Sequence, residues 1–189
     1  MTTIYFVRHA QPDEAVKNDR LRPLTEEGIR DTKAVTAFLK DRDIRLLMSS
    51  PYKRSRDTIK DLADTLHMHI HTDEALRERE IGIGYLGDPD GYIKRMWADF
   101  HFKSEGAECL AELQLRNILA IKKLLNEHSN ENIVIGTHGS ALSTMLNYYD
   151  SQYGYEDFIR MIHYFPYIVQ VKFEGETYLG RSEELIIEK

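Results

Sequence analysis

The chain of 189 residues is poor in cysteine, and Cys109 is the only one. No disulfide can therefore form within it, and a chain of this length does not need one because it can bury roughly 70% of its unfolded surface. No apolar segment follows a basic start at the N-terminus, as a secretion signal would require. We therefore expect a cytoplasmic protein.

Positive charge is also in short supply. The 31 acidic residues outnumber the 25 basic ones, and the formal net charge is -6. Such a chain has no general attraction for nucleic acid or for an anionic membrane, so we expect neither as a partner. Any anion that the protein binds must be held by a local cluster of basic side chains.

Repeats, low-complexity tracts and linkers are absent from the sequence, which favours a single domain over residues 1–189. Apolar runs alternate with amphipathic segments instead, and this alternation is typical of α/β proteins. Thr25 is expected to cap one helix, and Ser50 followed by Pro51 predicts the start of the next. We expect strands at 3–7, 45–50 and 133–135, one or two closing strands within 166–180, and helices at about 25–41, 51–66 and 108–128.

Three of the apolar runs end in polar or basic residues. The first ends in Arg8 and His9, the second in Ser49 and Ser50 leading to Arg54, and the third in Thr137 and His138. In open α/β sheets, ligands bind at the carboxyl ends of the strands, so these ends are expected to converge. Two arginines and two histidines around one point indicate a phosphate pocket, because arginine donates bidentate hydrogen bonds and stays charged.

At these residues the sequence resembles the histidine phosphatase superfamily, which contains cofactor-dependent phosphoglycerate mutases and many metal-independent phosphatases. Six separate segments match in the order of that superfamily, over roughly residues 4–139. The resemblance implies a three-layer α/β/α sandwich with a mostly parallel central sheet. The matching segments are Arg8-His9, "PLTEEG" (23–28), "SSPYKRSRDT" (49–58), "LRERE" (76–80), "GAEC" (106–109) and "THG" (137–139).

The resemblance also implies a role for each residue. His9 would attack phosphorus and form a phosphohistidine, without a metal or another cofactor. Arg8, Arg54 and His138 would hold the phosphoryl oxygens, and Glu78 would be the general acid. Gln11 and Gly139 complete the expected phosphate-binding set, and a small phosphorylated molecule is the expected substrate.

Some of these residues have other readings. Glu78 lies in a charged run with Glu74 and Glu80, and only its register within the resemblance favours it. Glu108 is expected to serve a helix N-terminus rather than catalysis. His67, His69 and His71 alternate, so on a strand they would share one face like metal ligands, although no acidic or sulfur partner completes the set.

The short insertion between the fourth and fifth segments favours hydrolysis. About 25 residues separate "LRERE" from "GAEC", which is little chain for the enclosing segments of a mutase. We therefore expect a phosphatase, with a small cap-like insertion at about 84–105 that selects the substrate. In that cap Tyr85, Tyr92, Trp97 and Phe100 could pack on a substrate body, and Lys94 or Arg95 could meet a second acidic group.

Three other functions stay open on the sequence: a phosphoglycerate mutase, a phosphate-binding module without turnover, and a metallohydrolase with His9, His138 and Glu78 as ligands. A homodimer is also possible, because the closing strand near 166–173 could pair with a second copy if it lay at a sheet edge.

Overall fold

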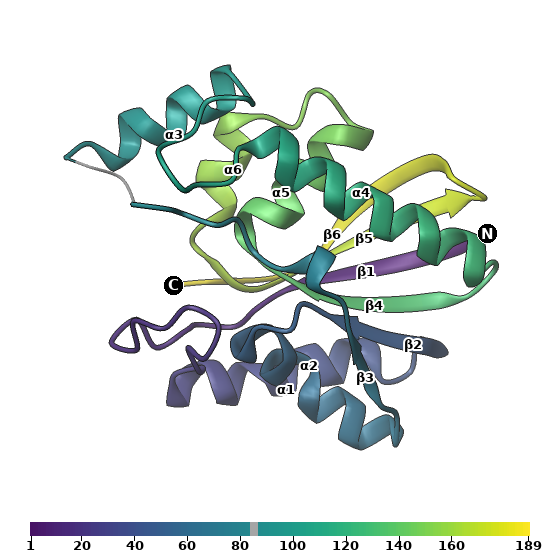
Figure 1. Ribbon diagram of the computed structural model, residues 1–189. Coiled ribbons are helices and arrows are strands. Elements are labelled where there is room, and N and C mark those ends of the chain that lie inside the picture. Colours follow the sequence, from purple (N-terminus) through teal and green to yellow (C-terminus); the bar gives the residue numbers. More distant parts are fainter. Residues whose placement is uncertain (84–86) are drawn as a thin grey trace.

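A six-stranded sheet forms the centre of the protein in the computed structural model, which describes residues 1–83 and 87–189. The strand order is β3-β2-β4-β1-β5-β6 (Figure 1). The first four strands pair in parallel and the last two in antiparallel fashion, which confirms the predicted α/β fold with a mostly parallel sheet. The strands are β1 (Thr2–Arg8), β2 (Ile44–Ser49), β3 (Ile70–Thr72), β4 (Asn132–Thr137), β5 (Tyr164–Glu174) and β6 (Thr177–Glu188).

Helices cover both faces of this sheet. In Figure 1, α1 (Glu26–Leu39) and α2 (Lys53–Leu66) lie below it, and α4 (Leu110–Glu127), α5 (Gly139–Tyr149) and α6 (Tyr155–Met161) lie above it. Side chains alternate along a strand, so β1 contributes to both layers. Ile4 and Phe6 belong to the core between the sheet and helices α4 and α5. Tyr5 and Val7 belong to the core between the sheet and helices α1 and α2.

The two predicted helix starts have different outcomes. The start of α1 is confirmed, because Thr25 Oγ1 accepts a hydrogen bond from the Gly28 N–H at 2.9 Å. The start of α2 was predicted too early, since the helix begins at Lys53 and Ser50 does not cap it. Ser50 is occupied elsewhere: its Oγ lies 2.7 Å from a ring nitrogen of His138.

The short helix α3 (Pro89–Ala98) lies at the far end of the upper layer (Figure 1). Its aromatic side chains face the protein, where Trp97 contacts Phe100 at 5.5 Å and Phe158 at 5.6 Å between ring centroids. Tyr92 donates from its hydroxyl to Ser104 Oγ at 3.1 Å. These rings therefore seat α3 on the domain, while Lys94 and Arg95 are exposed. Tyr85 lies outside the described residues.

The sheet edges differ from the expectation on which a homodimer was based. Residues 166–173 lie in β5, which is paired on both sides by β1 and β6, so this segment is not an edge. The edge strand at this end of the sheet is β6, and its register with β5 shifts at three places. Within the described part of the chain, no helix combines the length and the apolar character that crossing a bilayer requires.

Candidate active site

The carboxyl ends of β1, β4 and β2 bring the predicted site residues together. Arg8 pairs with Thr137 and Ser49 pairs with Gly136, so the three strands end at the same level of the sheet. His9 and His138 follow two of these ends, and their ring centroids are 5.3 Å apart. The sequence prediction that these strand ends converge is therefore correct.

Arg8 is buried, and its guanidinium is held by the end of α6 and the start of β5. Its Nη1 donates to the carbonyl oxygens of Met161 at 2.5 Å and Tyr164 at 2.9 Å. Its guanidinium carbon lies 3.9 Å from the ring centroid of Phe165. Burial lowers the pKa of Arg8 to about 9, even though the negative charge of Glu78 acts to raise it. Arg8 is therefore still a cation at neutral pH.

His9 has one ring nitrogen engaged by the backbone. Nδ1 lies 2.8 Å from the carbonyl oxygen of Ala10, which can only accept, so Nδ1 carries the proton. The lone pair of the neutral ring is then on Nε2. Burial, with the charges of Arg54 and Arg8, holds the pKa of His9 well below its usual range. The result is a neutral imidazole with a nucleophilic Nε2 at neutral pH.

Arg54, in the first turn of α2, is held by Asp19 from the loop between β1 and α1. Nη1 of Arg54 donates to the Asp19 carbonyl oxygen at 2.7 Å and to Oδ1 at 3.0 Å, and Nη2 donates to Oδ2 at 3.4 Å. The guanidinium carbon of Arg54 also lies 5.2 Å from the ring centroid of Tyr52, whose ring in turn contacts His138. These contacts orient the second arginine beside the two histidines.

His138 is fully buried at the N-cap of α5, with one ring nitrogen bound to Ser50. Ser50 Oγ accepts from the Tyr52 N–H at 3.2 Å and lies 2.7 Å from His138 Nε2, and its hydroxyl proton can be donated to Nε2. When Nε2 accepts in this way, His138 carries its proton on Nδ1. Burial and the charge of Arg54 hold the pKa of His138 well below its usual range, so the ring is neutral.

Glu78 faces the same helix start. Its Oε2 accepts from the Ser140 N–H at 2.9 Å, and its Oε1 accepts from the Ala141 N–H at 3.1 Å and the Arg79 N–H at 2.8 Å. These three N–H groups fix the orientation of the Glu78 carboxyl group. The carboxyl group of Glu78 thus lies at the start of the helix that His138 caps. Glu74 instead forms an ion pair with Arg20.

The structure places Gly139 next to Arg8, and it holds Gln11 against the start of α1. The side-chain oxygen of Gln11 accepts from Thr25 Oγ1 at 2.9 Å, so the side-chain nitrogen of Gln11 points away from Thr25. Gly28 packs so closely on the backbone of Gln11 that a Cβ there would clash with its carbonyl oxygen. Gly139 begins α5 beside Arg8, where a Cβ would lie 3.5 Å from Nε.

The expected helix-terminal role of Glu108 is wrong. Glu112 makes the backbone hydrogen bond of the capping box on α4, to the Cys109 N–H at 2.9 Å. Glu108 instead forms an ion pair with Arg116, with Oε1 2.6 Å from Nε. The carboxylate of Glu108 therefore binds Arg116, whose guanidinium contacts the backbone of Glu78.

The alternating histidines do not form a shared strand face. His67 is the C-cap of α2 with a left-handed φ of 54°, and only His71 lies within β3. The rings of His69 and His71 are in contact, at 5.0 Å between centroids. Across residues 1–83 and 87–189, no group of three or more His, Cys, Asp or Glu side chains is placed to hold a metal ion.

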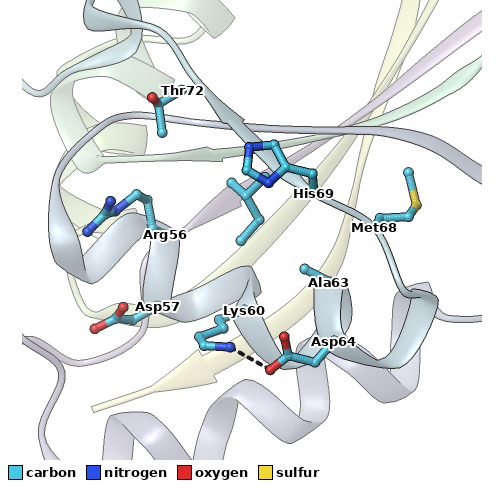
Figure 2. Close-up of a pocket in the computed structure, with 9 residues that line it drawn as sticks. Arg56, Asp57, Lys60, Ala63, Asp64, Met68, His69 and Thr72 are labelled. Carbon is cyan, nitrogen blue, oxygen red and sulfur yellow. Dashed lines mark hydrogen bonds and ion pairs between the residues drawn. The ribbon is translucent and has the colours of Figure 1, made fainter.

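A separate open cavity of about 550 Å³ lies between α2 and β3 (Figure 2). Three of its charged side chains are already paired, because Lys60 donates to Asp64 at 2.6 Å and Asp57 accepts from Lys53 at 2.7 Å. None of the predicted site residues lines this cavity. A smaller cavity of about 260 Å³ adjoins the site and is lined by Asp19, Arg20, Tyr52, Arg79, Glu80 and Ile81.

Sequence reasoning missed several residues that hold the site. Asp19 lies in the loop between β1 and α1 and Phe165 near the start of β5, neither in a motif of its own, and only the tertiary structure brings them to Arg54 and Arg8. Ser50 was noted as a helix cap, not as the partner of His138. The ion pair of Glu108 with Arg116 had no sequence signal either, because side chains eight residues apart are not neighbours on a helix.

Comparison with known proteins agrees with this geometry. The sequence model of the histidine phosphatase superfamily (branch 1) matches residues 4–180. The uncharacterized phosphatase PhoE of Bacillus subtilis is 25% identical over 150 residues, which cover 77% of this chain and 76% of PhoE. The probable phosphoglycerate mutase GpmB of Yersinia pestis is 26% identical over 163 residues, 78% of this chain and 74% of GpmB.

The fold is also shared with solved structures. A mycobacterial glucosyl-3-phosphoglycerate phosphatase aligns over 99% of both chains with a TM-score of 0.75 and 16% sequence identity. At 16% identity, this similarity supports the fold alone.

Proposed function

Because this chain belongs to the histidine phosphatase superfamily, branch 1, we propose that it hydrolyses a small phosphomonoester through a phosphohistidine on His9. The observation that carries the proposal is a pair of buried histidines, with ring centroids 5.3 Å apart, each of which has one ring nitrogen bound to the protein. His9 has its proton on Nδ1, next to Ala10 O, and His138 has its Nε2 next to Ser50 Oγ. One ring thus offers a nucleophile and the other a hydrogen-bond donor.

Two buried donors support a phosphate between these rings. Within the described residues, Arg8 Nε and His138 Nδ1 are buried without a hydrogen-bond partner. An unpaired buried donor is unfavourable, typically by about 1–3 kcal/mol, and such groups cluster where a ligand supplies the acceptor. Phosphoryl oxygens are strong acceptors, and Arg54 adds a second guanidinium from α2.

The first step transfers the phosphoryl group to the protein. The Nε2 lone pair of His9 forms the P–N bond while the ester P–O bond breaks. Arg8, Arg54 and His138 stabilise the charge on the three equatorial oxygens. A protonated Glu78 gives its proton to the leaving oxygen, so the product alcohol departs neutral.

The second step returns His9 to its starting state. A water molecule attacks phosphorus, Glu78 takes its proton, and the P–N bond breaks with its electron pair returning to Nε2. Inorganic phosphate is released and Glu78 is again protonated. The positive charge that a metal supplies in other phosphatases comes here from two arginines, so we propose a metal-independent reaction.

The substrate body is proposed to lie in the cavity beside Tyr52, which Arg20 and Arg79 line. We propose that the cap-like insertion predicted at about 84–105 selects this substrate body. We propose a cytoplasmic enzyme of one domain, in keeping with its single buried cysteine, Cys109. A homodimer would use β6, the free edge of the antiparallel end of the sheet.

A phosphoglycerate mutase is the second candidate, because GpmB is among the relatives. It differs from the phosphatase only in what accepts the phosphoryl group. Sustained conversion of 3-phosphoglycerate to 2-phosphoglycerate faster than phosphate release would establish it in place of the hydrolase.

The test is phosphate release from p-nitrophenyl phosphate in excess EDTA, with wild type, His9→Ala and the exposed control His69→Ala. We expect wild type and His69→Ala to be active in the chelator and His9→Ala to be inactive. Labelling with a ³²P-phosphomonoester should give an acid-labile label on wild type and His69→Ala and none on His9→Ala. Loss of wild-type activity in EDTA would indicate a metallohydrolase, and phosphate binding without turnover would indicate a binding module.

A further inference from the structure

Arg116, in the second turn of α4, contacts the chain segment that carries Glu78. Its Nη1 donates to the carbonyl oxygens of Ala75 at 2.7 Å and Arg77 at 2.8 Å. Its Nη2 donates to the carbonyl oxygen of Glu78 itself at 3.1 Å. One guanidinium therefore fixes three carbonyl groups within four consecutive residues, immediately before and at the expected proton donor.

Glu108 holds this guanidinium in place. Its two carboxylate oxygens accept from Nε and Nη2 of Arg116 at 2.6 and 2.8 Å, a bidentate pair. With these two bonds every N–H group of Arg116 has an acceptor. Both side chains are largely buried, at 16% exposed for Arg116 and 10% for Glu108.

Glu108 also contacts the segment on the far side of Glu78. Its N–H donates to the Glu80 carbonyl oxygen at 2.9 Å, and its carbonyl oxygen accepts from Arg79 Nη1 at 3.1 Å. The backbone around Glu78 is thus held on both sides, by Arg116 before it and by Glu108 after it. The Glu78 side chain leaves this held backbone toward the N–H groups of Ser140 and Ala141.

We propose that Arg116 and Glu108 are positioning residues that fix Glu78 for proton transfer to the leaving group. The inference rests on the proposed function, in which Glu78 is the proton donor. Among the described residues, the hydrogen bonds of Arg116 go to backbone carbonyls and to Glu108, so we infer that it acts through Glu78 and not on the substrate. Displacement of a catalytic group by about 1 Å can lower a rate about 100-fold, so a loosened segment has a measurable effect.

The ion pair of Arg116 with Glu108, here called the clamp, stays charged from mildly acidic to neutral pH. Burial acts to raise the pKa of Glu108, but the hydrogen bond and charge of Arg116, with the charge of Arg77, outweigh it and hold that pKa below its usual range. The ion pair therefore persists from mildly acidic to neutral pH. Its removal should change the efficiency of proton transfer and leave the attack by His9 in place.

The test compares two leaving groups. p-Nitrophenolate departs without protonation, whereas the alkoxide of 2-glycerophosphate needs a proton. The change in the ratio of kcat/KM for p-nitrophenyl phosphate to kcat/KM for 2-glycerophosphate between wild type and a variant reports on the transfer to His9, because the later dephosphorylation does not enter kcat/KM. The ratio is also unaffected if a variant is partly unfolded, since the active fraction cancels.

The variants are Arg116→Lys, Glu108→Gln and Glu78→Gln, with Arg45→Lys as a matched control on the surface. We expect the ratio to rise about 10- to 100-fold in Arg116→Lys and Glu108→Gln, at least as much in Glu78→Gln, and not at all in Arg45→Lys. A rise in Glu78→Gln alone would overturn the clamp and leave the proposed function standing. An unchanged ratio in Glu78→Gln would overturn both the proton-donor role and the clamp, while the His9→Ala test still decides the phosphohistidine.

Discussion

Asp19 binds Arg54 through both its backbone and its side chain, with Nη1 of Arg54 2.7 Å from the Asp19 carbonyl oxygen and 3.0 Å from Oδ1. The side chain of Arg54 is only 5% exposed, so this partner offsets the unfavourable burial of a cation. The same carboxylate pairs with Arg22 at 3.2 Å, which ties the loop before α1 to the site. Asp19 thus decides which edge of the guanidinium faces the histidines.

Replacing Asp19 with alanine should weaken phosphate binding. Without the carboxylate, Arg54 loses its fixed orientation, so we expect KM for p-nitrophenyl phosphate and the inhibition constant for inorganic phosphate to rise about tenfold, a change of about 1.4 kcal/mol. The free energy of unfolding should fall by about 1–2 kcal/mol. The control is Asp64→Ala, which breaks the exposed pair with Lys60 and should change neither. Unchanged phosphate inhibition in Asp19→Ala would show that Arg54 is oriented by other contacts.

Replacing Ser50 with alanine should change which ring nitrogen of His138 carries the proton. The hydroxyl is the partner of Nε2, so in the variant the proton is no longer directed to Nδ1. We expect a loss of about 1–3 kcal/mol in the free energy of unfolding, because a buried ring nitrogen is left unpaired. We also expect a fall in kcat/KM and a shift of the His138 ring nitrogens in ¹⁵N NMR spectra.

Ser55→Ala is the matched control for this prediction, since Ser55 is equally buried and bonds to Ser49 Oγ at 3.0 Å, not to a histidine. It should lower stability without altering the ¹⁵N shifts of His138. Identical spectra for wild type and Ser50→Ala would refute the tautomer assignment.

The centre of the fold was predictable because local patterns and tertiary structure agree there. Apolar runs that end in Arg8-His9 and in Thr137-His138 became β1 and β4, which pair in register. The same runs carried the motifs on which the family resemblance depends. Strand ends of a parallel sheet meet at one edge, so the meeting of these two pairs needed no long-range information.

The supporting contacts were not predictable in the same way. Phe165 reaches Arg8 from the antiparallel end of the sheet, and Asp19 reaches Arg54 from an irregular loop. Neither position shows a periodicity or a spacing that points to its partner. The misplaced start of α2 has a related cause: Ser50 and Pro51 favour a helix cap locally, but the tertiary contact with His138 takes the hydroxyl.

The two buried histidines should make the protein less stable as the pH falls through the mildly acidic range. Burial holds the pKa values of His9 and His138 well below 6.5, so the folded state keeps both rings neutral while the unfolded chain takes up two protons. The stability that they contribute is complete above pH 6.5 and is lost as the pH falls below it. The slope approaches about 1.4 kcal/mol per pH unit for each histidine.

Urea unfolding between pH 7.0 and 5.0, in buffers without phosphate, measures this slope. Phosphate must be avoided because a ligand of the folded state would add its own stabilisation. The double variant His9→Gln/His138→Gln should lose most of the dependence in this range, because carboxylates with ordinary or lowered pKa values titrate at lower pH. A single variant should lose about half. If the double variant kept the wild-type slope, other groups would be responsible, and the neutral state of the two rings in the folded protein would be disproved.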